Sequence, residues 1–590
     1  MAEYNGSKRN PLDWQDGLLA VGVFTAAMVL YVRTLATTLL LGDTGEYQVL
    51  AYTLGLAHGP GYPIYLLLAK LVTLLVPVGD IAYRVNLFSA ITGSLALALI
   101  YLIGRVTPLV RLTPLVRPTP LVRPKGRGRR CGNWRAAALV GPAALGVCQL
   151  FWWHAVIAET YNPGCAMLAL ILLLVVLWRK TANAWLLFWA GLVGGLSIGV
   201  HYTVLMAGPA ALLFLALAAP RRVDWLRAAG GTLLGLAICL GCYFAMDAYN
   251  PPSSFPNSIM APNLSVMDIT PQQFATPVGR VWYLISGRQF QGELFSLPKN
   301  RVMKNLDVYF KTMQAMFPRF VLGLAVLSLL ALLVYRGWRE SLLLVVIWLA
   351  MLVYIINYDI GDIYQFYVPS YVPLALAVSL GAACLLDGLA WLVAGLGRLL
   401  VRSGKPAAPE HALVPALGEG APRTRQFIPW TRWAASALGV LLVTALLWGV
   451  AAPSAAVIQK SWRLQRITFL DGTDWDSYPY PVTDPQWPHE VAKTINALVE
   501  DNAIIFTDWS LVYDIYYVAQ VEHERTGIAV HETYPAMTPK PFAVSARQYV
   551  KDNYGKRPIY FTLIEDSRLL LDYNFIEVDG SIPLYRLEKR

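Results

Sequence analysis

Residues 42–65 of this chain read GDTGEYQVLAYTLGLAHGPGYPIY. The stretch follows an apolar run, residues 18–40, that is long enough to cross a membrane. It places two carboxylates, Asp43 and Glu46, after that run and continues through a Gly-Pro-Gly-Tyr-Pro turn into another apolar segment. Charged side chains are costly inside hydrocarbon, so two acids at this position indicate a polar site at the edge of a bilayer.

The composition is typical of a membrane protein with many spans. Of the 590 residues, 56% are hydrophobic and 14% are charged, and the mean hydropathy is +0.47. A transmembrane helix needs about 20 largely apolar residues, and the sequence has roughly a dozen such runs. The first run is long enough to remain as a span, so we expect no cleavable signal peptide. The predicted fold class is a polytopic α-helical membrane protein.

Eleven segments are predicted to span the membrane. They are roughly residues 18–40, 84–104, 136–153, 163–178, 183–200, 203–219, 229–247, 318–335, 341–357, 366–392 and 433–452. The segment 62–79 is excluded because Pro63 and Pro77 leave only a short helix between them, and because it carries Lys70. We expect this segment to lie at the membrane surface or to re-enter from it.

The basic residues support this count and predict the orientation. With eleven spans and a cytoplasmic N-terminus, the loop 105–135, which is rich in Arg and has no acid, faces the cytoplasm of a cell-membrane protein. The other basic segments on that side are 179–180, 221–222, 336–339 and 398–432.

Residues 107–124 repeat a TPLVR unit whose prolines exclude a regular helix. We interpret the repeat as an extended insertion next to anionic headgroups, with no function assigned.

The chain from Pro453 onward has no membrane-length run. We predict a transmembrane module over residues 1–452 and a small extracytoplasmic α/β domain over residues 453–590. Strands are expected at 502–508, 527–532, 557–564 and 575–578, and helices at 489–501, 511–520 and 543–554. All six cysteines lie upstream, which excludes a disulfide framework in the tail. Acceptor recognition and a purely structural lid are equal alternatives for it.

Two interpretations fit Asp43 and Glu46. In the first, Asp43 caps a helix and Glu46, three residues later, completes a capping box. In the second, they are active-site carboxylates, because His58 and Arg84 place an imidazole and a guanidinium around the same outer loop, residues 41–83.

The N-terminal motifs favour the second interpretation. They are GDTGEY at 42–47, AHGPGYPIYLLLAKL at 57–71 and RVNLFSAITGSLALALIYLIGR at 84–105. They resemble the N-terminal block of GT-C glycosyltransferases related to the transmembrane protein O-mannosyltransferases. In that family an acidic motif, a His-Pro-Pro-Gly-Tyr-Pro segment and Arg-x-Asn occur in this order. The resemblance covers residues 18–105 well and continues weakly at 158–162, 195–203 and 360–371. Gly59 replaces the first proline of the family's segment, which loosens the turn.

The resemblance implies an inverting glycosyltransferase that moves a sugar, with mannose as one candidate, from a polyprenyl phosphate to an acceptor hydroxyl on the extracytoplasmic side. A hydroxyl attacks an anomeric carbon poorly unless a carboxylate accepts its proton. The departing phosphate needs cations or N–H donors. We therefore predict Asp43 as the general base and Glu46 as a secondary group that orients or binds the acceptor. The acceptor is a protein, a lipid or a glycan, and nucleic acid is not an expected partner.

Further residues are predicted to bind substrate. They are His58, Tyr62, Arg84, Asn86, Glu159, His201, Arg280, Arg288 and Asp362. Alternatives remain for several of them: a satisfied helix-end histidine for His201, a residue that snorkels to the interface for Arg84, and structural ion pairs for Glu159 and Asp362. The basic excess of the outer loop 248–317 fits lipid-phosphate binding or solvated surface charge.

No cofactor beyond the lipid-linked sugar is predicted, and a divalent metal is not favoured. Asp43 and Glu46 lack a nearby third carboxylate to complete an oxygen cage. Oligosaccharyltransferases, on a similar scaffold, do use a metal, and Glu159 or Asp362 could supply a ligand. The chief alternative function is a transporter or flippase of lipid-linked intermediates, but the paired half-repeats common in transporters are not visible. A receptor or scaffold does not need the clustered acid, His and Arg.

Overall fold

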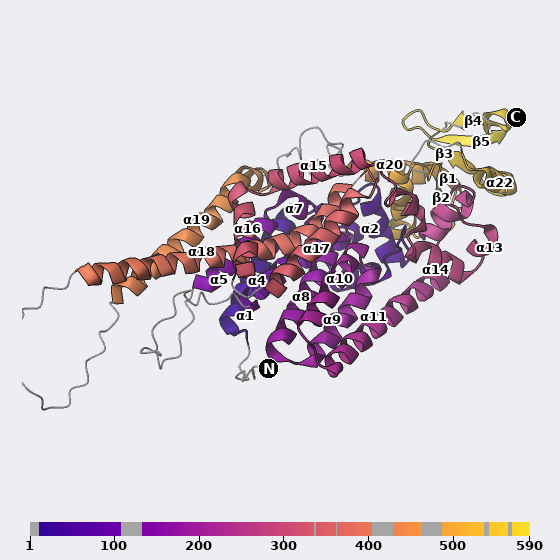
Figure 1. The fold of residues 1–590 in the computed structure, drawn as a ribbon. Coiled ribbons are helices and arrows are strands. Elements are labelled where there is room, and N and C mark those ends of the chain that lie inside the picture. The colour runs from indigo at the N-terminus through magenta and orange to yellow at the C-terminus, as the bar shows by residue number, and fades with distance from the viewer. Residues whose placement is uncertain are drawn as a thin grey trace, which may run out of the picture.

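The computed structural model of the protein describes residues 11–107, 133–334, 338–361, 363–403, 429–462, 486–535, 542–563 and 569–590. Most of it is a bundle of helices, and a five-stranded sheet with its own helices lies at the end of the bundle away from the N-terminus (Figure 1). Most of the TPLVR repeat, most of the 398–432 loop, and Asp362 lie outside the described residues.

The helical part has nineteen α-helices among the described residues. They are α1 (Trp14–Arg33), α2 (Asp43–Thr53), α3 (Pro63–Leu75), α4 (Ile81–Val106), α5 (Asn133–Ala138), α6 (Val140–Gly146), α7 (Gln149–Ala155), α8 (Tyr161–Thr181), α9 (Ala184–Leu196), α10 (Gly208–Leu217), α11 (Arg222–Tyr249), α12 (Ala261–Asn263), α13 (Pro271–Phe274), α14 (Pro277–Ile285), α15 (Lys299–Met316), α16 (Arg319–Val334), α17 (Trp338–Ile356), α18 (Tyr367–Ser403) and α19 (Pro429–Trp462). Short 3-10 or π helices are η1 (Ser197–Gly199), η2 (Tyr202–Ala207), η3 (Pro256–Met260), η4 (Arg288–Glu293) and η5 (Ile363–Phe366).

Six of the described helical segments are long and apolar enough to cross a membrane, within α1, α4, α8, α11, α17 and the η5–α18 segment. Two further pairs are bent: residues 135–146 meet α7 at 72°, and α15 meets residues 319–331 at 109°. Counting each pair as one span gives eight. The remaining apolar helices, including α3, α9, α10 and part of α19, are shorter. The chain is thus a multi-pass membrane protein, and the count of eleven spans stays a prediction.

The segment 62–79, which is not counted among the predicted spans, contains α3, a helix of 13 residues. Its exposed apolar side chains are Leu68, Leu71, Leu74 and Leu75. Such a face on a helix too short to cross hydrocarbon fits the predicted position at the membrane surface.

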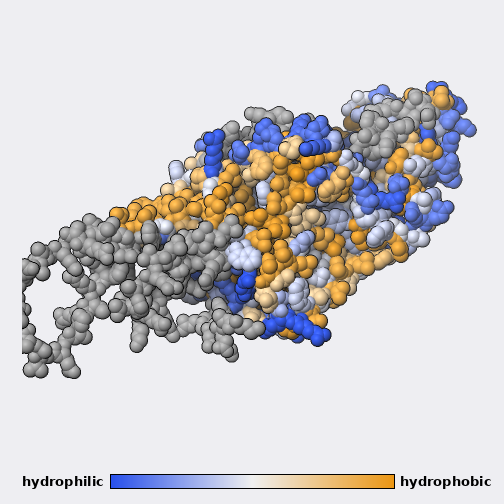
Figure 2. All heavy atoms as spheres, viewed as in Figure 1, coloured by the Kyte–Doolittle hydropathy of each residue, from blue (hydrophilic) through white to orange (hydrophobic). Residues whose placement is uncertain are grey.

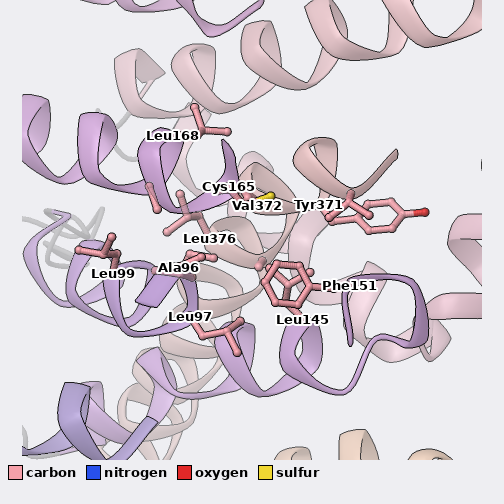
Figure 3. Close-up of a cluster of buried hydrophobic side chains, with 14 of the residues drawn as sticks. Ala96, Leu97, Leu99, Leu145, Phe151, Cys165, Leu168, Tyr371, Val372 and Leu376 are labelled. Atoms are coloured by element: carbon pink, nitrogen blue, oxygen red, sulfur yellow. The ribbon is translucent and has the colours of Figure 1, made fainter. Parts of the chain in front are cut away.

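The centre of the bundle is a cluster of buried apolar side chains from α4, α6, α7, α8 and α18 (Figure 3). Leu97, Leu145 and Leu376 belong to it and are almost fully buried. Helices α6 and α18 approach closely at Gly141, where an added Cβ would lie 2.0 Å from the carbonyl oxygen of Ala375. A side chain at this position would force the two helices apart, which explains the glycine.

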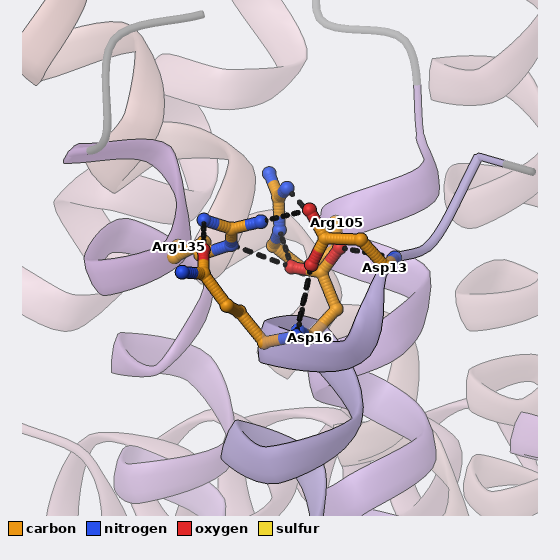
Figure 4. Close-up of polar contacts among 5 residues, drawn as sticks. Asp13, Asp16, Arg105 and Arg135 are labelled. Atoms are coloured by element: carbon orange, nitrogen blue, oxygen red, sulfur yellow. Dashed lines mark hydrogen bonds and ion pairs between the residues drawn. The ribbon is translucent and has the colours of Figure 1, made fainter.

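Ion pairs join three helices at the end of the bundle nearest the N-terminus (Figure 4). Asp16 on α1 accepts hydrogen bonds from Arg105 on α4, at 2.7 Å, and from Arg135 on α5, at 2.9 Å. The Asp16 side chain is 1% exposed and that of Arg105 is 7% exposed. Two basic residues at the ends of the predicted cytoplasmic loop 105–135 therefore join three helices of the fold.

The C-terminal part contains strands β1 (Ile504–Thr507), β2 (Ala529–Glu532), β3 (Ile559–Phe561), β4 (Tyr573–Glu577) and β5 (Tyr585–Lys589). Its helices are α20 (Gln486–Leu498), α21 (Trp509–Tyr516), η7 (Tyr517–Glu522), α22 (Val544–Asn553) and α23 (Leu569–Asp572). The strand order is β2-β1-β3-β5-β4. Strand β1 pairs in parallel with β2 and β3, whereas β5 pairs antiparallel with β3 and β4.

The predicted strands and helices of the tail overlap observed elements, but β5 and the four-residue helix α23 were not predicted. Strand β5 has the sequence YRLEK, a run of only five residues that contains three charges. Helix α19 continues to Trp462, so the predicted boundary at Pro453 falls inside a helix. The alanines around that position favour helix and explain the continuation. A separate C-terminal domain stays a prediction.

Candidate active site

Helix α2 begins at Asp43, and Gly42 before it is the N-cap, with φ +64° and no side-chain cap hydrogen bond. The capping interpretation of Asp43 and Glu46 is therefore wrong. Gly42 suits this position because a positive φ costs glycine little. Its backbone N–H donates to the carbonyl oxygen of Ser510, at 3.2 Å, which joins the start of α2 to α21. The side chain of Asp43 is thus left available for other contacts.

Asp43 contacts a residue from the far end of the chain. The indole Nε1 of Trp509, at the start of α21, donates to Asp43 Oδ1 at 3.0 Å. The other oxygen, Oδ2, accepts no hydrogen bond from any residue that the structure describes. Because Asp43 is only half-buried and lines a cavity, this oxygen can accept a hydrogen bond or a proton from a ligand.

Glu46 lies one turn further along α2 and is fully buried. Its Oε2 pairs with Nδ1 of His58, and its Oε1 accepts from the backbone N–H of His58 at 2.9 Å. The hydroxyl of Tyr513, on α21, also donates to Oε1 at 2.9 Å. Glu46 does not line the cavity. Glu46 holds the His58 ring in place, and its predicted role in orienting or binding the acceptor stays a prediction.

His58 carries positive charge near neutral pH. Burial lowers the pKa of His58, but the carboxylates of Glu46 and Asp43 outweigh this and raise it to about 9. The ring lies in an aromatic surround that includes Tyr62, at 5.4 Å between ring centroids, and Trp509, at 5.9 Å. Since Nδ1 is engaged by Glu46, the Nε2–H of this imidazolium is the group left to meet a ligand.

A cavity of 360 Å³ lies between the end of the bundle and the C-terminal part, and it is bordered by Asp43, His58, Tyr62 and Trp509. Its wall includes three acids, Asp43, Glu159 and Glu532, and two histidines, His58 and His201. Much of the rest is aromatic, contributed by α2, α8, η2, α17, η5 and α21. A mostly apolar cavity with a few convergent polar groups is the usual form of a small-molecule site.

Three further predicted residues lie at this cavity. Tyr62, the residue before α3, has φ +49° and stacks on His201 with 15° between the ring planes. His201 also accepts from the backbone N–H of Thr203 at 3.2 Å. It is therefore both the helix-end histidine of the alternative interpretation and part of the cavity wall. Glu159 is buried beside them, and its carboxylate accepts from the backbone N–H of Thr160 at 3.3 Å.

Arg84 and Asn86 do not line the cavity, and both make structural contacts, so their substrate contacts stay a prediction. The guanidinium of Arg84 donates to the carbonyl oxygens of Thr73, Val78 and Gly79, at 3.0 to 3.3 Å. It thereby ties the turn after α3 to the start of α4. Asn86 is fully buried. Its amide donates to Ala36 and accepts from Gln48, which fixes the segment between α1 and α2.

Arg280 and Arg288 form ion pairs within the protein, and their substrate contacts likewise stay a prediction. Arg280 makes two hydrogen bonds to Asp247, at 2.7 and 2.8 Å, and the Asp247 side chain is 1% exposed. Arg288 pairs with Asp268 at 2.9 Å. Neither lines the cavity. The basic excess of the long outer loop is therefore partly neutralised by its own acids. Asp362 lies outside the described residues.

Sequence reasoning missed the residues that the C-terminal part contributes, above all Trp509 and Glu532. Burial, together with nearby Asp508, Glu46 and Asp43, raises the pKa of Glu532 to about 8. A signal was present: Asp508 is the last residue of a predicted strand and lies shortly before a predicted helix, and such strand ends often face ligand sites. In the structure Asp508 caps α21 by accepting from Ser510 N, and so aims Trp509 at Asp43.

The described residues contain no group of three or more His, Cys, Asp or Glu side chains placed to hold a metal ion. Metal-free catalysis remains a prediction.

Comparison with known sequences supports the family resemblance. Residues 43–223 match the family model described as the Protein O-mannosyl-transferase TMEM260 N-terminal domain. The resemblance to O-mannosyltransferase-like proteins is thereby confirmed. The matched residues include Asp43, Glu46, His58, Glu159 and His201, and they end before the long outer loop.

Two curated relatives match short segments. Protein O-mannosyl-transferase TMEM260 of Mus musculus is 42% identical over 90 residues, which are 15% of this chain and 13% of that protein. Protein O-mannosyl-transferase tmem260 of Dictyostelium discoideum is 32% identical over 82 residues, which are 14% of this chain and 10% of that protein. The matched segments thus span only about a tenth of each relative's length.

A solved structure matches over almost the whole chain. ArnT of Cupriavidus metallidurans, bound to undecaprenyl phosphate, superimposes with a TM-score of 0.53 and 13% identity, covering 97% of this chain and 98% of that one. At this identity the likeness shows the fold alone. It agrees with the predicted polytopic helical fold of the GT-C kind.

Proposed function

We propose that this chain is a glycosyltransferase that moves a sugar from a polyprenyl phosphate to an acceptor hydroxyl in the cavity at Asp43. The observation that carries the proposal is the pairing of two groups at one cavity wall. Asp43 presents an oxygen without a hydrogen bond from a described residue, and His58 presents a cation held by Glu46. Sugar transfer needs both: a base for the attacking hydroxyl and a positive charge for the leaving phosphate.

In the proposed reaction, Asp43 Oδ2 accepts the proton of the acceptor hydroxyl as its oxygen attacks the anomeric carbon. The new bond joins that carbon to the acceptor oxygen, and the bond to the lipid phosphate oxygen breaks. The lipid phosphate leaves with the electron pair, and attack opposite the leaving group inverts the anomeric centre. Trp509 fixes the carboxylate by its bond to Oδ1, so that Oδ2 faces the cavity.

His58 is the proposed cation for the phosphate. Its Nε2–H can donate to a phosphate oxygen in the ground state and more strongly as charge develops. Glu46 keeps the ring protonated and in one orientation, and Tyr513 fixes Glu46. The aromatic wall of the cavity, which includes Tyr47 and Tyr62, offers flat apolar surfaces to the sugar ring.

Two observations support the proposed donor and the proposed side of the membrane. The similar ArnT structure contains undecaprenyl phosphate, which supports a polyprenyl-phosphate donor here. The cavity lies away from the N-terminal end of the bundle, where Arg105 and Arg135 are found. The positive-inside rule places that basic end in the cytoplasm and hence the cavity on the extracytoplasmic side. The names of the two matched relatives support mannose as the sugar and a protein as the acceptor.

A transfer assay tests the proposal. Purified protein is incubated with a panel of labelled undecaprenyl-phosphate sugars that includes mannose and with an acceptor panel, with Asp43→Asn as the critical variant. Asparagine keeps an oxygen for Trp509 but cannot accept a proton, so turnover should fall by a factor of about 10² to 10⁴. Binding of undecaprenyl phosphate should persist. Transport of intact lipid-linked sugar without transfer would support the flippase alternative, and near-wild-type turnover of Asp43→Asn would remove Asp43 as the base.

A further inference from the structure

One wall of the cavity is the carboxyl edge of the C-terminal sheet. Strands β1 and β2 are parallel, so their carboxyl ends meet at the same edge. The backbone N–H of Thr533, just after β2, donates to the carbonyl oxygen of Thr507, the last residue of β1, at 2.8 Å. Ligands of open α/β sheets bind beyond such edges. Trp509 follows β1 and is already assigned to Asp43; Glu532, the last residue of β2, is not used by the proposed reaction.

Glu532 is held at the cavity but its carboxyl group is unused. Its backbone oxygen accepts from Asn263 Nδ2 at 3.0 Å, which fixes the end of β2 to α12. Neither carboxyl oxygen bonds to a residue that the structure describes, although the side chain lines the cavity. Burial raises the pKa of Glu532 to about 8. The group is therefore a neutral acid near pH 7 and can donate a hydrogen bond.

A second unused polar group lines the cavity from the bundle side. Gln289, on η4, lines the cavity, and its Oε1 is buried without a hydrogen-bond partner among the described residues. A buried amide oxygen without a partner is unfavourable, so such atoms call for an explanation. In this orientation the oxygen is closed off from the cavity, and turning the amide over would present it to a ligand N–H and supply the missing bond.

We propose that Glu532 and Gln289 form the acceptor subsite and bind the main chain of a polypeptide acceptor, Glu532 donating to a carbonyl oxygen and Gln289 accepting from an N–H. The inference rests on the proposed function. The sheet lies beyond the end of the bundle (Figure 1). Hydrophilic residues gather over the C-terminal end, while apolar residues dominate the visible face of the bundle (Figure 2). The donor's prenyl chain must stay in the bilayer, so groups from the sheet meet the substrate that arrives from water.

The test separates acceptor binding from donor binding. The probes are a blocked peptide of Ala, Ser and Thr, labelled mannosyl-phosphoundecaprenol as donor, and undecaprenyl phosphate for lipid affinity. Glu532→Ala and Gln289→Ala should each raise the KM for the peptide about tenfold, the effect of losing one hydrogen bond. The affinity for undecaprenyl phosphate should not change. Matched controls are Glu577→Gln on exposed β4 and Gln272→Ala on exposed α13, both outside the cavity.

The conservative variant Glu532→Gln distinguishes a hydrogen bond to the acceptor from a purely structural role of Glu532. Glu532→Gln keeps an N–H donor, so its KM at pH 7 should stay within about threefold of wild type. The wild-type KM should rise above about pH 8 as Glu532 ionises, and that rise should be absent in Glu532→Gln. The titratable groups that face Glu532 are Asp508, Glu46 and Asp43, with His58 and His201 in the same cavity. They are present in both proteins and cancel in this comparison.

Three results would overturn the inference: an unchanged peptide KM in Glu532→Ala, an equal loss of lipid affinity, or the same alkaline rise in Glu532→Gln. The proposed function fails separately, if wild-type protein transfers no sugar from any donor. In that event the inference is tested by direct binding of the same peptide with a fluorescent label. Weaker binding by Glu532→Ala than by wild type supports the inference. Equal binding by the two proteins, or no binding by wild type, contradicts it.

Discussion

The indole of Trp509 donates to the carboxylate of Asp43 at 3.0 Å, across 466 positions of the chain. This bond joins α2, which follows the first span, to α21, which is the first helix after β1. The hydroxyl of Tyr513, one turn further along α21, bonds Glu46 in the same way. The C-terminal part is therefore built into the candidate active site and orients two of its acids. A purely structural lid does not account for these contacts.

Trp509→Phe tests the importance of this bond. Phenylalanine keeps a ring beside His58 and Tyr513 but lacks the N–H donor, so turnover should fall by about ten- to a hundredfold, in line with the loss of a hydrogen bond to a charged group. Exposed Trp487→Phe is the matched control. In an Asp43→Asn background the same change should have little further effect, because the base that Trp509 orients is already lost. Fully additive losses would show that Trp509 acts independently of Asp43.

Glu46→Gln tests the charge on His58. Removing the carboxylate removes a main cause of the high pKa of His58, so its pKa should fall from about 9 towards its ordinary value of about 6.5. Activity that needs the imidazolium is present below this pKa and is lost as pH rises through it. The alkaline limb of the pH–rate profile should therefore move to lower pH in the variant. An unmoved limb would contradict the assigned role of His58.

Asp16→Ala tests the ion pairs at the N-terminal end of the bundle. It leaves the buried guanidinium of Arg105 without its carboxylate, and breaking such a pair typically destabilises by about 3 to 5 kcal/mol. The midpoint of thermal unfolding in detergent should fall clearly. Asp307→Ala, which removes an exposed pair with Lys311, is the control and should change stability by less than about 1 kcal/mol. Equal effects of the two variants would be inconsistent with a buried network.

Asp514→Asn tests an unusual carboxyl group on α21. Asp514 is fully buried, neither oxygen has a hydrogen-bond partner among the described residues, and a Cβ added to Gly45 on α2 would lie 2.8 Å from Oδ1. Burial raises the pKa of Asp514 well above its ordinary value. The unfolded carboxyl releases its proton near pH 4, so the stability of the folded protein falls as pH rises above about 4.

Asparagine cannot ionise, so the variant should lose this decline. The difference between its unfolding midpoint and that of wild type should therefore increase from pH 4 to pH 8. Asp552→Asn, at an exposed position on α22, should show no such trend. A difference between Asp514→Asn and wild type that does not depend on pH would mean that Asp514 ionises freely in the folded protein.

Local patterns in the sequence determined the helical bundle, the short surface helix α3 and most strands of the tail. These features depend on runs of apolar residues, on prolines and on strand-forming segments, all of which are close together in the chain. The same is true of Asp43 and His58, which lie on one short stretch. Their residue types were therefore enough to predict a site near the membrane edge.

Only the tertiary structure decided which charged groups reach the cavity. Arg84, Arg280 and Arg288 are basic residues in or beside predicted outer loops, but each is engaged by a carbonyl oxygen or an acid that folding brings near it. Trp509 and Glu532 reach the cavity because α21 packs on α2 and because parallel pairing brings the ends of β1 and β2 together. Such long-range pairings depend on the whole fold, and no local spacing in the sequence encodes them.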